Sequence, residues 1–175
     1  MTDTPLPIRI VGIGNVLMGD DGLGPYVVQI LESRYEFPDH VEIVDGGTPG
    51  LDFLPYLSHA GAVIILDTVS SKGEPGTLKT YRDGEIIGSA PPPRLTPHQP
   101  GLREALMATE LTDTSPGEMV LFGVIPSTLD QGTVLSEPVQ ASVETMIDAV
   151  VEELDRLDAA PVLRETPLET DLWWI

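Results

Sequence analysis

Short apolar runs that alternate with segments of helical periodicity are the feature that most constrains the fold of this 175-residue chain. The most apolar run, AVIIL at residues 62–66, is typical of a central strand that is covered on both faces. The sequence also predicts strands over residues 8–13, 41–44, 77–81 and 119–124. It predicts helices over residues 24–35, 51–57, 101–109 and 138–157.

This alternation predicts an α/β fold, a three-layer α/β/α sandwich around a five-stranded, mostly parallel mixed sheet. We expect one strand to be antiparallel. Only nine residues separate Asp67, after the third strand, from Thr77 at the start of the fourth. Because a parallel crossover needs a longer connection, the fourth strand should run against the third.

The chain is expected to hold a single domain over residues 1–157 and a C-terminal tail over residues 158–175. The tail has no periodicity and two prolines, so we expect weak order, with an end at Trp173-Trp174-Ile175 that could dock on the domain or on a partner. Residues 83–101 contain five prolines and are interpreted as a stiff loop, which at this length is usually functional or mobile.

The charge balance excludes several classes of function. Nine basic residues against 28 acidic ones give a net charge of −19, which argues against binding to nucleic acid or to anionic membranes. A basic peptide or a metal cation would be attracted, although an acidic surface that keeps a protein soluble explains the number equally well. No apolar run approaches the roughly 20 residues of a membrane-spanning helix, no secretory signal is visible, and there are no cysteines. We therefore expect a cytoplasmic protein without membrane insertion.

Residues 12–24, GIGNVLMGDDGLG, join the first strand to the first helix and have the outline of a nucleotide-binding turn. The dinucleotide pattern G-x-G-x-x-G requires glycine at position 17, where Leu17 stands, and no P-loop motif occurs in the chain. The adjacent carboxylates of Asp20 and Asp21 would also repel a pyrophosphate. Nucleotide binding is therefore disfavoured, and one of the two aspartates is a candidate cap for the following helix.

Aspartates also follow the first three predicted strands, as Asp21, Asp45 and Asp67. The carboxyl ends of the strands in an open α/β sheet are where ligands bind, so we expect these three carboxylates on one edge. Like charges that lie close raise one another's pKa unless a cation neutralises them, which favours a divalent metal. The alternative is that each aspartate only caps a following turn.

Three histidines are available as metal ligands: His40, His59 and His98. His40 and His59 are expected on the surface towards the opposite edge, whereas the proline-rich loop can bring His98 to the strand ends. Asp21, Asp67 and His98 would then supply two carboxylates and one imidazole. That set suits nickel, zinc or manganese and leaves open coordination positions.

The sequence resembles the hydrogenase maturation protease family, the endopeptidases that process the large subunit of [NiFe] hydrogenases. The resemblance covers about residues 8–157 and rests on six segments in the family's order and spacing: GIGNVLMGDDGLG at 12–24, VEIVDGGTPGL at 41–51, IILDTV at 64–69, PGTL at 75–78, TPHQ at 96–99 and FGVIP at 122–126. Relatives often carry glutamate where this chain has Asp21, which leaves the reach of that side chain open.

The resemblance implies that Asp21, Asp67 and His98 contact nickel, supplied by the [NiFe] hydrogenase large-subunit precursor, or another divalent metal in vitro. It implies that the enzyme removes a C-terminal extension of the nickel-loaded precursor. Whether the metal acts in catalysis or only positions the peptide stays open, and in the second case Asp45 is a candidate general base.

The DGGTPG loop is a candidate substrate-binding segment through Gly46, Gly47 and Thr48, because glycines let the backbone approach a peptide closely. A plain strand-to-helix turn is the alternative for this loop. Two other functions compete with the protease: a non-catalytic nickel-binding assembly factor or chaperone, and an α/β metallohydrolase that acts on small substrates and holds its own metal.

Overall fold

The structure is a computed structural model that describes residues 5–48, 51–87 and 99–175. The elements follow one another along the chain as β1 (Ile8–Ile13), η1 (Gly19–Gly22), α1 (Leu23–Arg34), β2 (Tyr35–Glu36), β3 (Val41–Gly47), η2 (Leu51–Phe53), α2 (Leu54–Leu57), β4 (Ala62–Thr68), β5 (Leu78–Arg82), α3 (Gly84–Ile87), α4 (Gln99–Leu111), β6 (Glu118–Val124), α5 (Glu137–Arg156) and β7 (Val162–Leu163). None of the helices among these residues is long and apolar enough to span a membrane.

The main sheet has five strands in the order β3-β1-β4-β6-β5. Strands β3, β1, β4 and β6 are parallel, and β5 pairs antiparallel with β6. The predicted fold class and the antiparallel direction of the fourth main strand are therefore confirmed. That strand, β5, is not adjacent to β4, because β6 lies between them.

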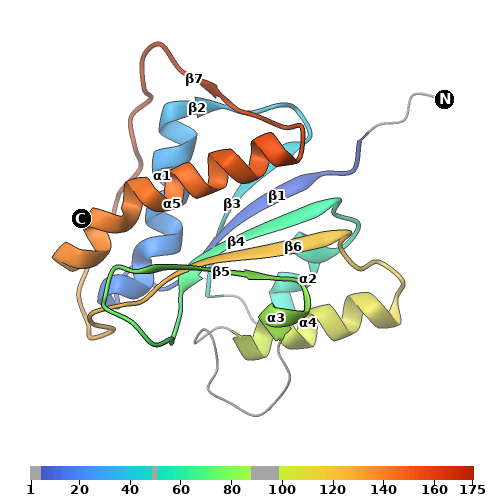
Figure 1. The fold of residues 1–175 in the computed structure, drawn as a ribbon, viewed down its shortest axis with the longest axis horizontal. Helices are drawn as coiled ribbons and strands as arrows, with labels where there is room; N and C mark the ends of the chain where they lie inside the picture. The colour runs from blue at the N-terminus through green and yellow to red at the C-terminus, as the bar shows by residue number, and fades with distance from the viewer. Residues whose placement is uncertain (1–4, 49–50, 88–98) are drawn as a thin grey trace.

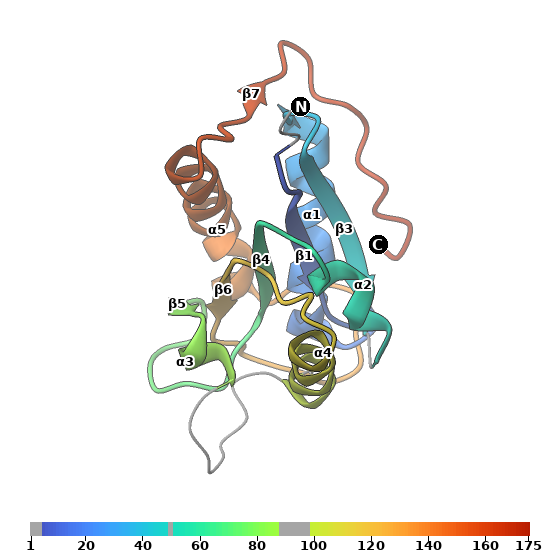
Figure 2. The same ribbon diagram turned by 90° about the vertical axis from the view of Figure 1, so that its right-hand side faces the viewer.

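Helices cover both faces of this sheet, with α1 and α5 on one face and α2, α3 and α4 on the other (Figures 1 and 2). The strand residues alternate between the two layers, as the pleat requires. In β4, for example, Ile64 and Leu66 pack in the α1–α5 core, whereas Val63 and Ile65 pack in the α2–α4 core. The sheet is thus the middle of three layers.

Two strands run further than their apolar residues predict. β3 continues to Gly47 and β4 to Thr68, so Asp45 and Asp67 lie inside strands rather than after them. Pairing with neighbouring strands continues past the apolar runs, since Asp45 is opposite Gly12 and Asp67 is opposite Gly123. The expected loop over residues 83–101 also contains helix α3, and residues 88–98 lie outside the described part of the chain.

The C-terminal tail lies against α1 and the edge of the sheet. β7 pairs antiparallel with β2, and Ser33 and Leu168 exchange two hydrogen bonds: Ser33 Oγ donates to Leu168 O at 2.6 Å and Leu168 N donates to Ser33 O at 2.9 Å. The division at residue 157 and the weak order expected of the tail stay predictions, which hydrogen exchange at the Leu168 amide would test.

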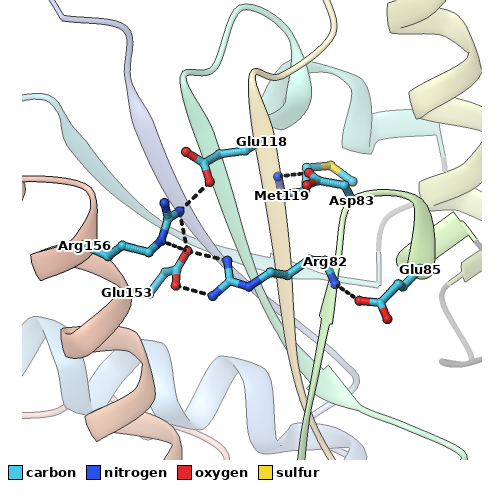
Figure 3. Close-up of polar contacts among 7 residues, drawn as sticks. All are labelled: Arg82, Asp83, Glu85, Glu118, Met119, Glu153 and Arg156. Atoms are coloured by element: carbon cyan, nitrogen blue, oxygen red, sulfur yellow. Dashed lines mark hydrogen bonds and ion pairs between the residues drawn. The ribbon is translucent and has the colours of Figure 1, made fainter.

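The amino end of β6 carries a network of ion pairs, shown in Figure 3. The carboxylate of Glu153, which is 5% exposed, accepts two hydrogen bonds from Arg82, at 2.9 and 2.6 Å, and is also paired with Arg156 at 2.8 Å. Arg156 additionally pairs with Glu118. The two guanidinium groups lower the pKa of Glu153 to about 2, Arg82 having the larger effect. The network ties α5 to β5 and β6.

Candidate functional site

The glycines of residues 12–24 allow helix α1 to begin directly on the ends of two strands. A Cβ at Gly24 would collide with the carbonyl oxygens of Ile13, the last residue of β1, and of Leu66, near the end of β4. Gly14 has φ +145°, and a side chain there would collide with the Asp21 carbonyl oxygen. The glycines therefore serve close backbone packing. This packing holds η1, with Asp20 and Asp21, next to β4.

Asp20 holds the β1–α1 connection against the segment before α5. Its carboxylate is completely buried and accepts hydrogen bonds from Ser127 N at 2.8 Å, Thr128 N at 3.0 Å, Ser136 N at 2.7 Å and Ser136 Oγ at 2.9 Å. Backbone hydrogen bonds between Gly19, Leu17 and Gly132 continue the contact. The hypothesis that an aspartate caps α1 is wrong, because its N-cap is Gly22 and no side chain caps it.

Two of the three predicted metal ligands, Asp21 and Asp67, are buried carboxylates near the carboxyl ends of the central strands. Asp21 is 7% exposed and its Oδ2 accepts a hydrogen bond from Asn15 N at 2.8 Å. Asp67 is completely buried and its Oδ1 accepts one from Thr68 N at 2.7 Å. The elements that carry them, η1 and β4, are in contact. The predicted third ligand, His98, lies outside the described residues.

Asp45 lies apart from Asp67. β3 directs Val41 and Ile43 into the α1–α5 layer, so alternation places Asp45 on that face, whereas Asp67 follows Val63 and Ile65 on the α2–α4 face. Strands β3 and β4 flank β1, which separates them by roughly 10 Å. Within residues 5–48, 51–87 and 99–175, no three histidine, aspartate or glutamate side chains are grouped closely enough to hold a metal ion. The three aspartates share an edge of the sheet without forming one cluster.

The glycines after Asp45 form a bulge in the β1–β3 pairing. Gly12 is opposite Asp45 and Ile13 is opposite Gly47, so Gly46 is the extra residue. Gly47 has φ +57°, and a Cβ added to it would meet no atom of the described residues within 4 Å, so its outer side is open. Bulges commonly redirect side chains beside active sites, and this one lies next to the exposed Asp45.

Beside this bulge is a cavity of about 270 Å³. Its lining comes from the β1–α1 connection, from the end of β3 and from the C-terminus of the chain: Gly14, Asn15, Val16, Leu17, Asp45, Gly47, Thr48, Trp173 and Trp174. Of the candidate substrate-binding residues, Gly47 and Thr48 line the cavity, and Gly46 packs towards Val11 on β1. The tail contains no motif that predicts its contribution to this cavity.

The remaining histidines lie away from the carboxyl ends of the strands. His59 is exposed in the connection before β4 and His40 is partly exposed immediately before β3, both at the amino ends of these strands. Their expected positions towards the opposite edge are confirmed. The role of Asp20 could not be predicted from the sequence, because Asp20 and Asp21 are adjacent and chemically identical, and the donors to Asp20 come from more than 100 residues away.

The comparisons with known proteins all indicate the same family. The model of the HycI hydrogenase maturation protease family matches residues 25–153. The chain is 36% identical over 159 residues to the Hydrogenase 2 maturation protease of Escherichia coli, an alignment that covers 90% of this chain and 96% of that protein. It is 40% identical over 145 residues to the hydrogenase expression/formation protein HupM of Azotobacter chroococcum, covering 82% of this chain and 69% of that protein.

Among solved structures, the hydrogenase maturating endopeptidase HybD from Escherichia coli superposes with a TM-score of 0.84 at 35% identity. That alignment covers 91% of this chain and 98% of the other. The sequence matches and the shared sheet topology lead to one conclusion. The chain belongs to the hydrogenase maturation protease family and is a peptidase.

Proposed function

We propose that this peptidase removes a C-terminal extension from the large-subunit precursor of a [NiFe] hydrogenase after nickel has been inserted. The observation that carries the proposal is the pair of buried carboxylates, Asp21 and Asp67, on elements in contact at the carboxyl ends of the central strands. The role of the relatives in hydrogenase maturation supports the same substrate. Nickel belongs to the precursor in this proposal and is part of the substrate.

In the proposed complex, Asp21, Asp67 and His98 bind the nickel of the precursor. Asn15 N donates a hydrogen bond to one oxygen of Asp21, and Thr68 N donates one to an oxygen of Asp67. These hydrogen bonds fix both side chains, so the direction of the second oxygen of each carboxylate is defined as well. Two carboxylates and an imidazole are donors that suit nickel and other divalent metals. A precursor without nickel lacks this anchor, so cleavage waits until the metal is in place.

Binding at the nickel brings the scissile peptide to the enzyme by proximity, which is worth several kcal/mol of activation free energy. The metal can then polarise the peptide carbonyl or activate water. The alternative is that Asp45 acts as a general base on the attacking water. Asp45 lies on the other face of the sheet from Asp67, roughly two strand spacings away, which favours cleavage chemistry at the nickel.

Incubation of purified precursor with the purified chain, followed by mass measurement, tests the proposal. We expect the nickel-loaded precursor to lose its C-terminal extension and the nickel-free precursor to remain intact. His98→Ala should abolish processing, and His59→Ala is the matched control, because His59 is an exposed imidazole at the amino end of β4, away from the carboxyl ends of the strands. Equal processing of both precursors, or full activity of His98→Ala, would remove the nickel anchor from the proposal.

The same assay separates the competing functions. An assembly factor would bind the nickel-loaded precursor without shortening it. A metallohydrolase with its own metal would retain stoichiometric metal after purification, which elemental analysis measures. Loading the precursor with another divalent metal tests whether the anchor is specific for nickel, since carboxylate and imidazole donors also accept zinc or manganese.

A further inference from the structure

We propose that the cavity between Trp173, Trp174 and Asp45, here called the tryptophan cavity, binds a basic side chain of the precursor, arginine or lysine. The inference rests on the proposed function, since it names a part of the precursor that this peptidase recognises. The nickel site and this cavity would then hold two separate features of the same substrate.

The contacts of the C-terminal tail deliver the two tryptophans to this place. The chain passes from β7 down the side of the molecule beside β3 (Figure 2). Arg164 continues the attachment, with Nη1 at 2.9 Å from Glu36 Oε1 and its backbone N donating to Arg34 O at 2.8 Å. Trp174 is 9% exposed and Trp173 is 70% exposed, and their rings meet edge to face with centroids 5.7 Å apart. One ring is anchored and the other is presented to solvent.

The lining of the tryptophan cavity has the chemistry of a site for a basic side chain. The tryptophan rings and the partly exposed Leu17 offer apolar surface to the methylene stem, and an indole face attracts a guanidinium or ammonium group. Asp45 Oδ1 accepts a hydrogen bond from Gly47 N at 3.1 Å, and no described residue donates to Oδ2. Among the residues that the structure describes, Asp45 is the only charged one that lines this cavity.

The surrounding charge also favours a cation. Glu32 on α1 has a raised pKa, first because burial removes water from its carboxyl group and second because the negative charge of Asp45 acts on it. A positive group near Asp45 would relieve that repulsion. The chain as a whole carries −19, so a basic segment of a partner is attracted at long range as well. These observations select a basic side chain over a neutral one.

The composition of the chain provides a local probe. Trp173 and Trp174 are its only tryptophans, so indole fluorescence and the indole N–H signals in NMR report on this cavity alone. We would titrate the full chain with N-acetyl-arginine methylamide and, as the matched neutral control, with N-acetyl-citrulline methylamide, which has nearly the same shape. We expect saturable shifts of both indole signals with the arginine probe and none with the citrulline probe.

Asp45→Asn should weaken binding of the arginine probe about fivefold while the indole signals of the free protein stay in place, because only the charge changes. Trp173→Ala should weaken it less, and Trp173→Phe should restore most of the affinity through its aromatic face. Equal shifts with the arginine and citrulline probes, or an unchanged affinity of Asp45→Asn, would overturn the proposal. The probe requires no cleavage, so this result is independent of whether the chain processes the precursor.

With the nickel-loaded precursor, Asp45→Asn should raise KM and leave kcat nearly unchanged. If Asp45 were instead the general base, kcat would fall and KM would stay constant. Replacement of the basic residues in the C-terminal region of the precursor by glutamine, one at a time, identifies the side chain that is bound. For that residue the effects of the precursor substitution and of Asp45→Asn should not add. Full additivity at every basic residue contradicts the proposed contact.

Discussion

At the amino end of β6, Glu153 is buried between Arg82 and Arg156, whereas near the carboxyl ends of β1 and β4 the carboxylates of Asp21 and Asp67 accept hydrogen bonds from backbone amides. Guanidinium groups neutralise a carboxylate, and amides orient it while it keeps its charge. The first arrangement stabilises the fold. The second holds anionic oxygens in fixed directions, which is what recognition of a cation requires.

The largest effect on activity, which would separate the two ends of the sheet, is expected for Asp67→Asn. The amide keeps the size of the side chain and an oxygen for the Thr68 N–H group but removes the negative charge. We expect processing of the nickel-loaded precursor to fall by about 100-fold or more, equivalent to about 3 kcal/mol of activation free energy. The free energy of unfolding should change much less than the activation free energy, because the Thr68 N–H group keeps its acceptor.

Initial rates of precursor processing and urea unfolding of the same preparation measure these two quantities for Asp67→Asn. A loss of stability as large as the loss of activity would show that Asp67 serves the fold, as Glu153 does, and the contrast between the two ends would disappear. Glu153→Gln is the matched control for a neutralised buried carboxylate.

The largest effect on stability is expected for Asp20, which lies in the same region as the proposed nickel site yet has a structural role. Asp20→Ala leaves the amides of Ser127, Thr128 and Ser136 without their acceptor, and we expect the free energy of unfolding to fall by about 3–5 kcal/mol. Urea unfolding measures it. Asp130→Ala, an exposed aspartate in the connected segment, should change stability by less than about 0.5 kcal/mol.

The adjacent pair Asp20 and Asp21 marks the limit of sequence-based prediction at this site. The apolar runs predict where the strands lie in the sequence. The fold class and the positions of Asp21 and Asp67 near the strand ends could therefore be predicted. The turn of η1 determines which carboxylate of the pair faces the segment before α5. The resulting tertiary contact joins residues that lie more than 100 positions apart in the chain. No local pattern encodes such a contact.

The sequence also did not predict on which face of the sheet each aspartate lies, although the apolar runs before Asp45 and Asp67 contain part of that information. Asp45 and Asp67 each follow an apolar run, which suggested one cluster of three aspartates. Their opposite directions follow only once both strands are known to continue through them, because a shift of one residue reverses every side chain. The tail has no periodic pattern, so its position at the tryptophan cavity could not be derived from the sequence.

The third prediction concerns the ion-pair network at the amino end of β6. Glu153→Gln removes the charge between Arg82 and Arg156 and retains hydrogen-bonding capacity, so the free energy of unfolding at pH 7 should fall by about 1–3 kcal/mol. The kcat/KM for precursor processing should not change, because this network lies at the amino end of β6, where Glu118 begins the strand, whereas Asp67 lies near the carboxyl end of β4. A matched decrease of kcat/KM would show that the two ends are coupled.

The fourth prediction concerns the pH dependence of the stability difference between the wild-type chain and Glu153→Gln. The pKa of Glu153 is lowered from 4.5 to about 2 by its arginine partners, so its contribution is fully present above pH 4.5 and is lost as the pH falls through about 2. The stability difference between the wild-type chain and Glu153→Gln should therefore shrink between pH 4.5 and 2. Urea unfolding of both proteins across this range measures it, and a constant difference would contradict the ion-pair explanation.

The smallest effect is expected for Glu118→Gln at the rim of the same network. Glu118 pairs with Arg156, but both side chains are well exposed, at 39% and 46%, so water screens the pair and replaces it when it is lost. We expect stability to fall by no more than about 0.5 kcal/mol, with Arg156 still bound to Glu153. High salt should remove this small difference and leave most of the Glu153→Gln effect, because the Glu153 carboxylate is buried. If both differences vanished together, the stabilisation at this end would come from surface charge in general and not from the buried Glu153 carboxylate.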